Sequence, residues 1–426
     1  MTLVFVIFLV LVAIGMPIAF AIGISGFVFF LSQETLNLTI PAQVTLTQTQ
    51  NFAMLAIPLF VLAGNCLNET GMTRRLMDFA SALTGHMRAG LGHVGAVSSF
   101  MMGGVTSSAI GDATMFSRVL GPSMTARGYQ PGFSAGVVGT TSIIVTMVPP
   151  GTGLILYGTL GEVSIGQLFA AGIIPGILMT IMLMGAISLT ARRRGYPPER
   201  ATRTPAGEVA RKGVQSIWAL LFPVILILGL RFGLFTPSEA GAFAVVYGLA
   251  VGLFAYRELT WEKFQRALRS TMTDVGMIMF LIAVSGMWAY GLTWDRVPQQ
   301  IMSVLLGITE NPIAIMAILV VALLIAGMFM DSTVLILLLT TMLVPVAQQV
   351  GLDPIHFGIV MVLTLTLGLL TPPVGIVMLI VCQSFKTTVS EYFKHSKYLF
   401  LALIALIVLL ILVPGIATWL PGLLYT

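Results

Sequence analysis

Charged side chains are scarce in this sequence, and their scarcity excludes a soluble globular protein. Asp, Glu, Lys and Arg together make up 9% of the 426 residues, whereas 57% of the residues are hydrophobic. A soluble domain carries about 25% charged residues. Apolar runs of the length needed to cross a bilayer, about 20 residues, recur along the whole chain. We therefore predict an all-α integral membrane protein.

Cysteine is also rare, and the motifs of catalysis and nucleotide binding are missing. Cys66 and Cys382 both lie in apolar runs, which argues against a disulfide framework. The four histidines lack the spacing of a zinc site, and no Gly-x4-Gly-Lys-Ser/Thr motif is present to bind ATP phosphates. No nucleophile can be paired with a base. We therefore expect neither catalytic residues nor a cofactor, and a polytopic membrane enzyme is disfavoured.

The 21 basic residues indicate the orientation of the chain. They cluster in short segments between apolar runs, and such segments lie on the cytoplasmic side of a membrane, which is not the pattern of a nucleic-acid face. The densest cluster predicts a cytoplasmic linker at residues 192–214. The first apolar run, residues 2–31, is too long for a signal-peptide core and is expected to be a retained span. Alternating sides from the linker predicts a cytoplasmic N-terminus and a C-terminus on the outer side.

Two apolar stretches are each flanked at both ends by segments of the same kind of charge. Residues 89–124 lie between basic segments and carry the small, hydroxyl-rich sequence GGVTSS in their middle. Residues 313–344 lie between Glu310 and Asp353, with no basic residue at either end. Each stretch is predicted to enter the membrane and return to the same side. A non-helical turn at membrane depth is tolerated only where protein buries it or where it lines a cavity.

The two halves of the chain match at an offset of 223 residues without gaps. Matched positions at residues that constrain the backbone are Gly104 with Gly327, Pro122 with Pro345, Pro131 with Pro354, and Pro149-Pro150 with Pro372-Pro373. The two copies have opposite loop charges, because the arm at residues 73–88 is basic and its counterpart at 296–311 is not. Shared architecture with opposite orientation predicts an inverted repeat, a common plan of secondary transporters.

This repeat predicts five regions. Residues 1–88 hold the scaffold helices and arm of the first repeat, 89–191 its transport elements (hairpin 89–124, interrupted helix 132–157), 192–214 the linker, 215–311 the scaffold helices and arm of the second repeat, and 312–426 its transport elements (hairpin 313–344, interrupted helix 354–382).

The interrupted helices are candidate ion sites. Two adjacent prolines in mid-span remove backbone donors and free the preceding carbonyls. Such carbonyls, together with Thr141 in the first half and Thr364 and Thr371 in the second, are hard oxygen ligands suited to Na⁺. A simple proline kink is the alternative interpretation. The presence of Pro-Pro flanked by Gly and Thr in both halves favours the site.

The hairpin tips are the natural partners of these interruptions. Half-helix termini present free backbone groups to an ion or a carboxylate. Asp112 and Asp331 lie near the tips at membrane depth, where a carboxylate costs about 2.5–3.5 kcal/mol on insertion scales. Both are therefore functional candidates, although an acid can also simply cap a hairpin helix.

Four segments carry a resemblance to a known family. PLFVLAG at residues 58–64, GGVTSSA at 103–109, GMFMDS at 327–332 and GLLTPPVG at 368–375 resemble the large membrane subunit (DctM type) of tripartite ATP-independent periplasmic (TRAP) transporters. The resemblance covers nearly the whole chain. It implies a bacterial inner-membrane protein whose outer side, with the C-terminus, is the periplasm.

The resemblance also implies a function. Such a subunit imports organic anions, for example C4-dicarboxylates or sugar acids, by Na⁺ symport and an elevator motion. Its partners are a separate small membrane subunit and a periplasmic substrate-binding protein. Alternatives are a one-component carboxylate exchanger or efflux carrier with a related hairpin fold, and the permease of an ATP-driven importer.

Site residues are carried over by position. A first Na⁺ site would include Ser107, Ser108, Thr141, Val148 and Pro149, and a second Asp331, Ser332, Thr333, Thr364 and Thr371, with Thr106, Ser107, Ser332 and Thr333 against the substrate and Asp112 as a further candidate. No metal other than Na⁺ is implied. The chain departs from the family pattern at the first tip, where Thr-Ser-Ser replaces the more usual Ser-Gly-Ser, and at the first interruption, where Pro-Pro-Gly replaces Pro-Pro-Ser.

Overall fold

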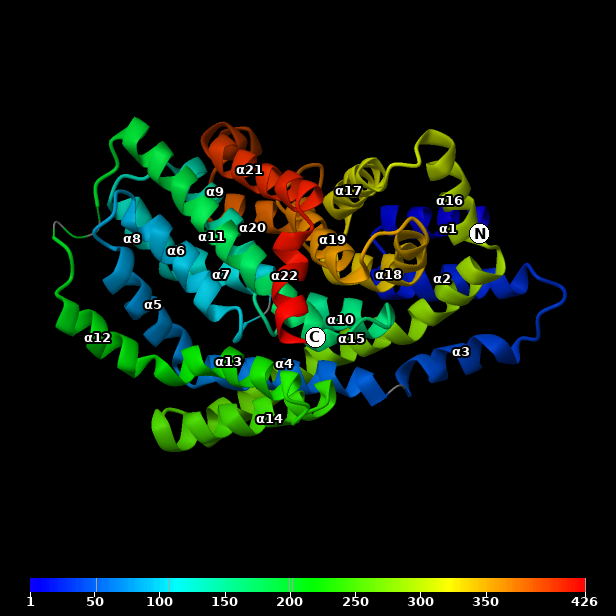
Figure 1. The fold of residues 1–426 in the computed structure, drawn as a ribbon, viewed down its shortest axis with the longest axis horizontal. Helices are drawn as coiled ribbons and strands as arrows, with labels where there is room; N and C mark the ends of the chain where they lie inside the picture. Colours follow the sequence, from blue (N-terminus) through cyan, green and yellow to red (C-terminus); the bar gives the residue numbers. More distant parts are fainter. Residues whose placement is uncertain (51, 107, 199, 201, 426) are drawn as a thin grey trace.

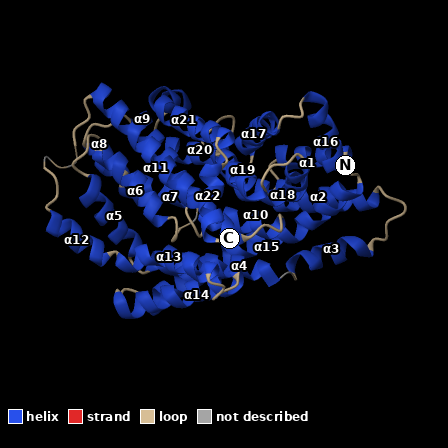
Figure 2. Cartoon of the chain, in the orientation of Figure 1, coloured by secondary structure: helices blue, strands red, loops and turns tan. Residues whose placement is uncertain are grey.

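The computed structural model describes residues 1–50, 52–106, 108–198, 200 and 202–425. Within these ranges all regular secondary structure is helical (Figure 2), and the one isolated β-bridge joins Arg88 and Pro198. The prediction of an all-α protein is confirmed.

One group of helices is joined by contacts through α4, α14 and the 34-residue helix α15, and its helices α3, α4, α13 and α14 lie along the lower edge of Figure 1. Its members are α1 (Thr2–Ala13), α2 (Ile18–Leu31), α3 (Thr39–Thr49), η1 (Phe52–Leu55), α4 (Ala56–Glu69), α13 (Ile217–Arg231), α14 (Pro237–Ala250), η3 (Val251–Ala255) and α15 (Trp261–Trp294). We call this group the scaffold.

A second group packs mainly within itself and is called the inner block. It comprises α6 (Gly90–Met102), α7 (Ala109–Val119), α8 (Gly121–Ala126), α9 (Pro131–Ser142), η2 (Ile143–Thr146), α10 (Thr152–Leu160), α11 (Ile165–Arg194), α17 (Pro312–Phe329), α18 (Ser332–Gln349), α19 (Pro354–Gly368), α20 (Ile376–Ser384), α21 (Val389–Leu412) and α22 (Gly415–Leu424). Several of these helices start at residues suited to the purpose: Pro131 and Pro354 occupy first-turn positions, and Asp353 accepts hydrogen bonds from the first backbone N–H groups of α19.

Three short helices connect the two groups: α5 (Met72–Thr84), α12 (Ala206–Gln215) and α16 (Val297–Ile308). Helix α5 is fixed to the scaffold by Arg75, whose guanidinium lies 2.6 Å from Glu258 and 4.0 Å from the centre of the Tyr256 ring. The Ser216 hydroxyl, just before α13, donates to the Arg75 carbonyl at 3.0 Å. The arm and the end of the linker are therefore held at one place on the scaffold.

Among the described residues, seven helices are long and apolar enough to cross a membrane. They are η1 with α4, α11, α14 with η3, α15, α17, α18 and α21. A further pair, α12 and α13, passes the same test together but bends by 58°. The chain is therefore a multi-pass membrane protein by length and composition.

The prediction that residues 2–31 form one span is wrong. Helix α1 ends at Ala13, Gly15 adopts a left-handed conformation with φ of 86°, and Pro17 precedes the start of α2. A left-handed glycine followed by proline ends a helix and redirects the chain, because proline cannot continue the hydrogen-bond ladder. Helices α1 and α2 then pack against each other.

These two helices lie along the last third of α15. Phe5 and Phe8 both make edge-on ring contacts with Trp288, and the Met1 amino group pairs with Asp295. The chain thus runs away from Asp295 along α1 and returns along α2. The predicted cytoplasmic N-terminus and the predicted outer position of the segment after Trp294 cannot both hold, because the structure brings the two together.

We predict that residue 2 is accessible from the same side of the membrane as Glu310, and from the opposite side to Arg203 in the linker. Single cysteines at Thr2, Glu310 and Arg203 would be labelled with an impermeant maleimide in whole cells. Both native cysteines, which are buried, would first be replaced by alanine (C66A and C382A). Labelling of T2C together with R203C, and not with E310C, would contradict this arrangement.

Candidate functional site

The first hairpin is formed by α6 and α7, and its tip is stabilised by local hydrogen bonds. Ser108 is the N-cap of α7 and accepts from the Gly111 N–H at 3.2 Å. The Thr106 hydroxyl donates to the Met102 carbonyl at 3.5 Å, a long hydrogen bond. The third predicted hydroxyl, Ser107, lies outside the described residues.

This tip rests on the first helix break. Helix α9 ends at Ser142 and continues as the 3₁₀ turn η2 to Thr146, and α10 starts at Thr152 after a cis Pro149-Pro150 bond. A Cβ on Gly103 would overlap the Val148 side chain, and a Cβ on Gly104 would lie 3.5 Å from the Pro149 carbonyl oxygen. The structure therefore brings the predicted residues Val148 and Pro149 to the tip.

Thr141 lies elsewhere. Its hydroxyl donates to the Val137 carbonyl at 2.8 Å and faces Gly95 on α6. Gly95 precedes Gly103 by eight residues, which is about 12 Å along a helix. Thr141 is therefore about two turns below the tip, away from the other predicted ligands of the first site.

The second hairpin is formed by α17 and α18. Asp331 is the N-cap of α18, and its Oδ1 accepts from the Thr333 N–H at 2.8 Å. Ser332, the first residue of α18, is buried, whereas Thr333 is half-buried. Asp331 therefore caps a hairpin helix, which was the alternative interpretation of this acid. Its Oδ1 makes the capping hydrogen bond, and its Oδ2 is left available to a ligand.

The second tip is joined to the second helix break by backbone hydrogen bonds. The Met328 carbonyl accepts from the N–H groups of Val374 and Gly375, at 3.3 and 3.1 Å. Gly327 and Gly368 are in such close backbone contact that a Cβ on either would overlap the other chain segment. The Pro372-Pro373 bond is cis, like its counterpart.

Two threonines at this break differ in their partners. The Thr371 hydroxyl donates to the Gly368 carbonyl at 2.9 Å. The Thr364 hydroxyl is fully buried and has no hydrogen-bond partner among the described residues. The next residue, Leu365, contacts Gly327 of the tip. A buried hydroxyl without a partner is costly and marks a place where an ion or a water molecule fits.

The element starts in the two halves keep the offset of 223 residues. Helix α7 begins at Ala109 and α18 at Ser332, and α9 begins at Pro131 and α19 at Pro354. The N-caps Ser108 and Asp331 are separated by the same offset. The same local geometry is therefore built with a hydroxyl in one half and a carboxylate in the other.

Asp112 is fully buried in the first turn of α7, one turn behind the tip. The Ser99 hydroxyl of α6 donates to its Oδ2 at 3.5 Å, while Oδ1 has no partner among the described residues. The N-terminus of a helix favours negative charge. Sequence reasoning missed Ser99, and the adjacent hydroxyls of Ser98 and Ser99 within an apolar helix were the available signal.

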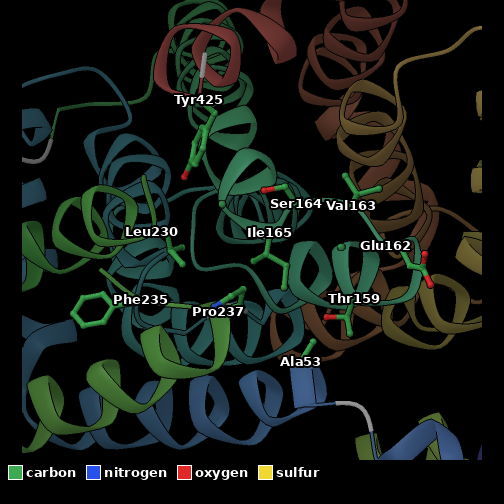
Figure 3. Close-up of a pocket in the computed structure, with 12 residues that line it drawn as sticks. Ala53, Thr159, Glu162, Val163, Ser164, Ile165, Leu230, Phe235, Pro237 and Tyr425 are labelled. Atoms are coloured by element: carbon green, nitrogen blue, oxygen red, sulfur yellow. The ribbon is translucent and has the colours of Figure 1, made fainter. Parts of the chain in front are cut away.

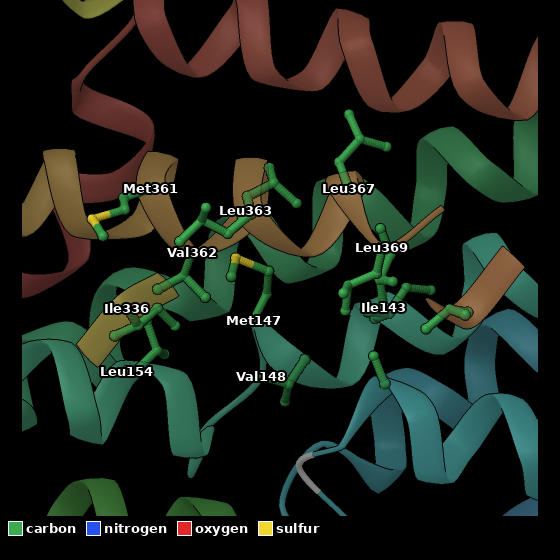
Figure 4. Close-up of a cluster of buried hydrophobic side chains, with 14 of the residues drawn as sticks. Ile143, Met147, Val148, Leu154, Ile336, Met361, Val362, Leu363, Leu367 and Leu369 are labelled. Atoms are coloured by element: carbon green, nitrogen blue, oxygen red, sulfur yellow. The ribbon is translucent and has the colours of Figure 1, made fainter. Parts of the chain in front are cut away.

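An apolar core separates the two breaks (Figure 4). Met147 and Val148 of the first break, Leu154 of α10 and Ile336 of α18 lie opposite a row of α19 side chains that ends at Leu369 of the second break. The two breaks, and with them the two predicted ion sites, are therefore separated by hydrocarbon side chains.

A cavity of about 440 Å³ lies between the inner block and the scaffold (Figure 3). Glu162 and Ser164 of the α10–α11 connection and Ile165 at the start of α11 line it on one side, and Leu230 and Pro237 line it from the scaffold. No predicted site residue lines it. Among the described residues no group of three His, Cys, Asp or Glu side chains could hold a metal ion.

Two solved structures that this chain resembles in fold are membrane transporters. The YdaH transporter of Alcanivorax borkumensis superposes with a TM-score of 0.59 at 14% identity, covering 87% of each chain. MtrF of Neisseria gonorrhoeae, from a class of antimetabolite efflux pumps, gives 0.50 at 13% identity, covering 86% of this chain and 83% of its own. At these identities the likeness concerns the fold.

Sequence comparison is more specific. The chain is 34% identical over 405 residues to the 2,3-diketo-L-gulonate TRAP transporter large permease protein YiaN of Escherichia coli, covering 95% of both proteins. It is 34% identical to the sialic acid TRAP transporter large permease protein SiaM of Vibrio cholerae, covering 87% of this chain and 86% of that protein. The profile of the family described as "Tripartite ATP-independent periplasmic transporter, DctM component" matches residues 5–416. The chain therefore belongs to the DctM family, the large permease subunits of TRAP transporters.

Proposed function

We propose that this protein is the large permease subunit of a Na⁺-coupled secondary importer of organic anions, such as C4-dicarboxylates or sugar acids. The observation that carries the proposal is the contact of each hairpin tip with a Pro-Pro helix break. The same contact between a hairpin tip and an interrupted helix occurs in both halves, which are offset by 223 residues. This supports the inverted-repeat plan, in which substrate and ions bind near the midplane.

The second half offers the better-defined cation site. Asp331 Oδ2 and the unpaired Thr364 hydroxyl lie on the two segments that meet at the tip contact. The break at 369–375 adds carbonyls that the prolines leave without intrahelical donors. A carboxylate, a hydroxyl and carbonyls together form a set of hard oxygen ligands for Na⁺. In the first half, Ser108 and the carbonyls of residues 147–151 are the corresponding groups.

Co-transported cations would offset the electrostatic cost of importing an anion. Moving one negative charge into a cell with an inside-negative potential costs about 2.3 kcal/mol per 100 mV. A carboxylate substrate therefore needs co-transported cations that at least cancel its charge. One Na⁺ for each half would cancel the charge of a dicarboxylate.

An elevator motion of the inner block against the scaffold fits the contacts at the first tip. Gly104 lies against Phe222 and Pro223 of α13, and the Val105 carbonyl lies against Gly64 of α4. Glycine at such contacts leaves a smooth surface. The cavity in Figure 3 lies on the same boundary between the inner block and the scaffold.

Members of this family work with a small membrane subunit and a substrate-binding protein, and a fused permease occurs among the relatives. We propose that this chain uses a separate small subunit and a periplasmic binding protein. Because the connection after Trp294 is free of basic residues except Arg296, we place it, and with it the N-terminus, on the periplasmic side with the C-terminus. This revises the predicted cytoplasmic N-terminus.

Uptake by proteoliposomes that contain this chain and its small subunit should require both an inward Na⁺ gradient and the binding protein. The assay would use a radiolabelled carboxylate that the binding protein retains. Uptake that is unchanged after replacement of Na⁺ by choline would contradict the proposal of Na⁺ coupling. Uptake without the binding protein, accelerated by internal anion, would instead establish the one-component exchanger.

T364V tests the second ion site. Valine keeps the shape of threonine and removes an unpaired buried hydroxyl, so the fold should be retained or slightly stabilised. If the hydroxyl is an ion ligand worth about 1.4 kcal/mol, the Na⁺ concentration for half-maximal thermal stabilisation should rise about tenfold. The measurement is the unfolding temperature of the purified protein in NaCl, with choline chloride at matched ionic strength.

T366V is the matched control. Thr366 lies two residues further along the same helix, is equally buried, and its hydroxyl donates to the Val362 carbonyl at 2.9 Å. T366V should leave the Na⁺ dependence unchanged. Equal Na⁺ dependence in T364V and the parent protein would remove Thr364 from the site.

A further inference from the structure

A second cavity lies at the other end of the molecule, away from both hairpin tips. It has a volume of about 510 Å³ and is lined by Met87, Arg88, Ser188 and Arg192. Met87 and Arg88 belong to the connection between α5 and α6, whereas Ser188 and Arg192 belong to the last turns of α11. In Figure 1 this is the left end of the molecule, where the linker leaves α11 toward α12.

The charge of this cavity is unbalanced. Among the described residues, neither Arg88 nor Arg192 forms an ion pair with a carboxylate, and none of those that line the cavity is acidic. Other basic residues near the linker are paired, for example Arg200 and Lys212 with Glu208. The free N–H groups at the start of α6 follow Arg88 directly and add positive potential. The cavity therefore suits an anion.

The third polar residue in the cavity, Ser188, contacts a buried histidine. The Ser188 hydroxyl lies 3.2 Å from Nε2 of His93, a fully buried residue of α6. One hydrogen bond to the histidine leaves the hydroxyl with further capacity toward the cavity. Ser188 thus lies between a fixed buried partner and the two arginines.

The backbone around Arg88 is also fixed. The Ala89 N–H donates to the Pro197 carbonyl at 3.2 Å, and the Arg200 N–H donates to the Gly85 carbonyl at 3.0 Å. The linker therefore pairs with both ends of the connection that carries Arg88 and holds it beside α11. The two arginines come from segments more than 100 residues apart and are brought together by this pairing.

An exposed apolar stripe continues from the cavity along α11. Ile177, Ile181 and Leu189 are 40%, 59% and 43% exposed, and Gly185 has no atom within 4 Å of where its Cβ would be. Spacing of four residues places these positions on one face of the helix, in line with Arg192. From Ile177 to Arg192 the stripe is about 22 Å long, enough to cross the half of the hydrocarbon core, about 15 Å, that one leaflet occupies.

We propose that this cavity binds the phosphate headgroup of an anionic phospholipid of the inner leaflet, with an acyl chain lying along the stripe on α11. Cationic pockets between membrane helices on the cytoplasmic side are suited to such headgroups. The apolar stripe selects a phospholipid over free phosphate, because inorganic phosphate has nothing to place there. This proposal does not depend on the Na⁺ sites or on the transported anion.

Native mass spectrometry of the purified, delipidated full-length chain tests the proposal. Dioleoylphosphatidylglycerol should add one tightly bound molecule per chain, and dioleoylphosphatidylcholine should add none at the same concentration. The double variant R88Q/R192Q should weaken phosphatidylglycerol binding about tenfold or more. The matched control R203Q/R211Q removes the same charge from exposed positions of the same linker region and should bind like the parent protein.

The variant G185F tests the stripe with both arginines in place. Phenylalanine at this open position should fill the stripe and weaken phosphatidylglycerol binding without a change in the unfolding temperature. Equal weakening by R203Q/R211Q would show diffuse electrostatic attraction and overturn the proposal. Full phosphatidylglycerol binding by G185F, together with displacement of the lipid by millimolar inorganic phosphate, would also overturn it by indicating a free-anion site.

Discussion

A helix broken inside a bilayer leaves backbone groups that no water can satisfy, and the rest of this structure depends on how those groups are paired. Each half contains one such break, and in each half a hairpin tip closes over it. At the second break the Met328 carbonyl accepts from two consecutive N–H groups, those of Val374 and Gly375. Unsatisfied groups of this kind cost several kcal/mol in hydrocarbon, so tip and break are required to stay together.

This pairing explains the glycines at the contacts. Gly327 meets Gly368, and Gly103 meets Val148, at distances that admit no side chain on the glycine. At the second contact backbone meets backbone, whereas at the first the Val148 side chain occupies the space that a Cβ on Gly103 would need. The carbonyls and hydroxyls that remain unpaired after the approach, Thr364 above all, are then the groups available to a cation. The same constraint that stabilises the broken helix therefore leaves free the groups of the proposed ion site.

The sequence allowed the breaks and tips to be predicted because proline and glycine act locally. Pro-Pro ends a helix wherever it stands in a span, and the positions at which α9 and α19 begin also follow from single prolines. The same kind of signal, a glycine and a proline, was present at Gly15 and Pro17. The surrounding run is long and uniformly apolar, so one span was predicted where two short helices pack together.

Side-chain partners could not be predicted, because they depend on which helices meet. Thr141 and Thr364 occupy equivalent positions and are both fully buried, yet one hydroxyl is paired with Val137 and the other has no partner in the described structure. The contact between Ser99 and Asp112 crosses from one arm of a hairpin to the other. Sequence spacing carries no information about such contacts between helices.

The two halves also differ in where the second helix of the hairpin carries its carboxylate. At the equivalent N-cap positions the first half has Ser108 and the second Asp331, so only the second tip places a full negative charge against its break. The first half carries its acid at Asp112, one turn further along α7, where the Ser99 hydroxyl donates to it. A cation at the second break is therefore neutralised directly, whereas one at the first relies on dipoles from hydroxyls and carbonyls. Dipolar sites are weaker than charged ones at equal geometry, so the second site should fill first as Na⁺ rises. In this proposal the two sites share their backbone geometry and differ in Na⁺ affinity.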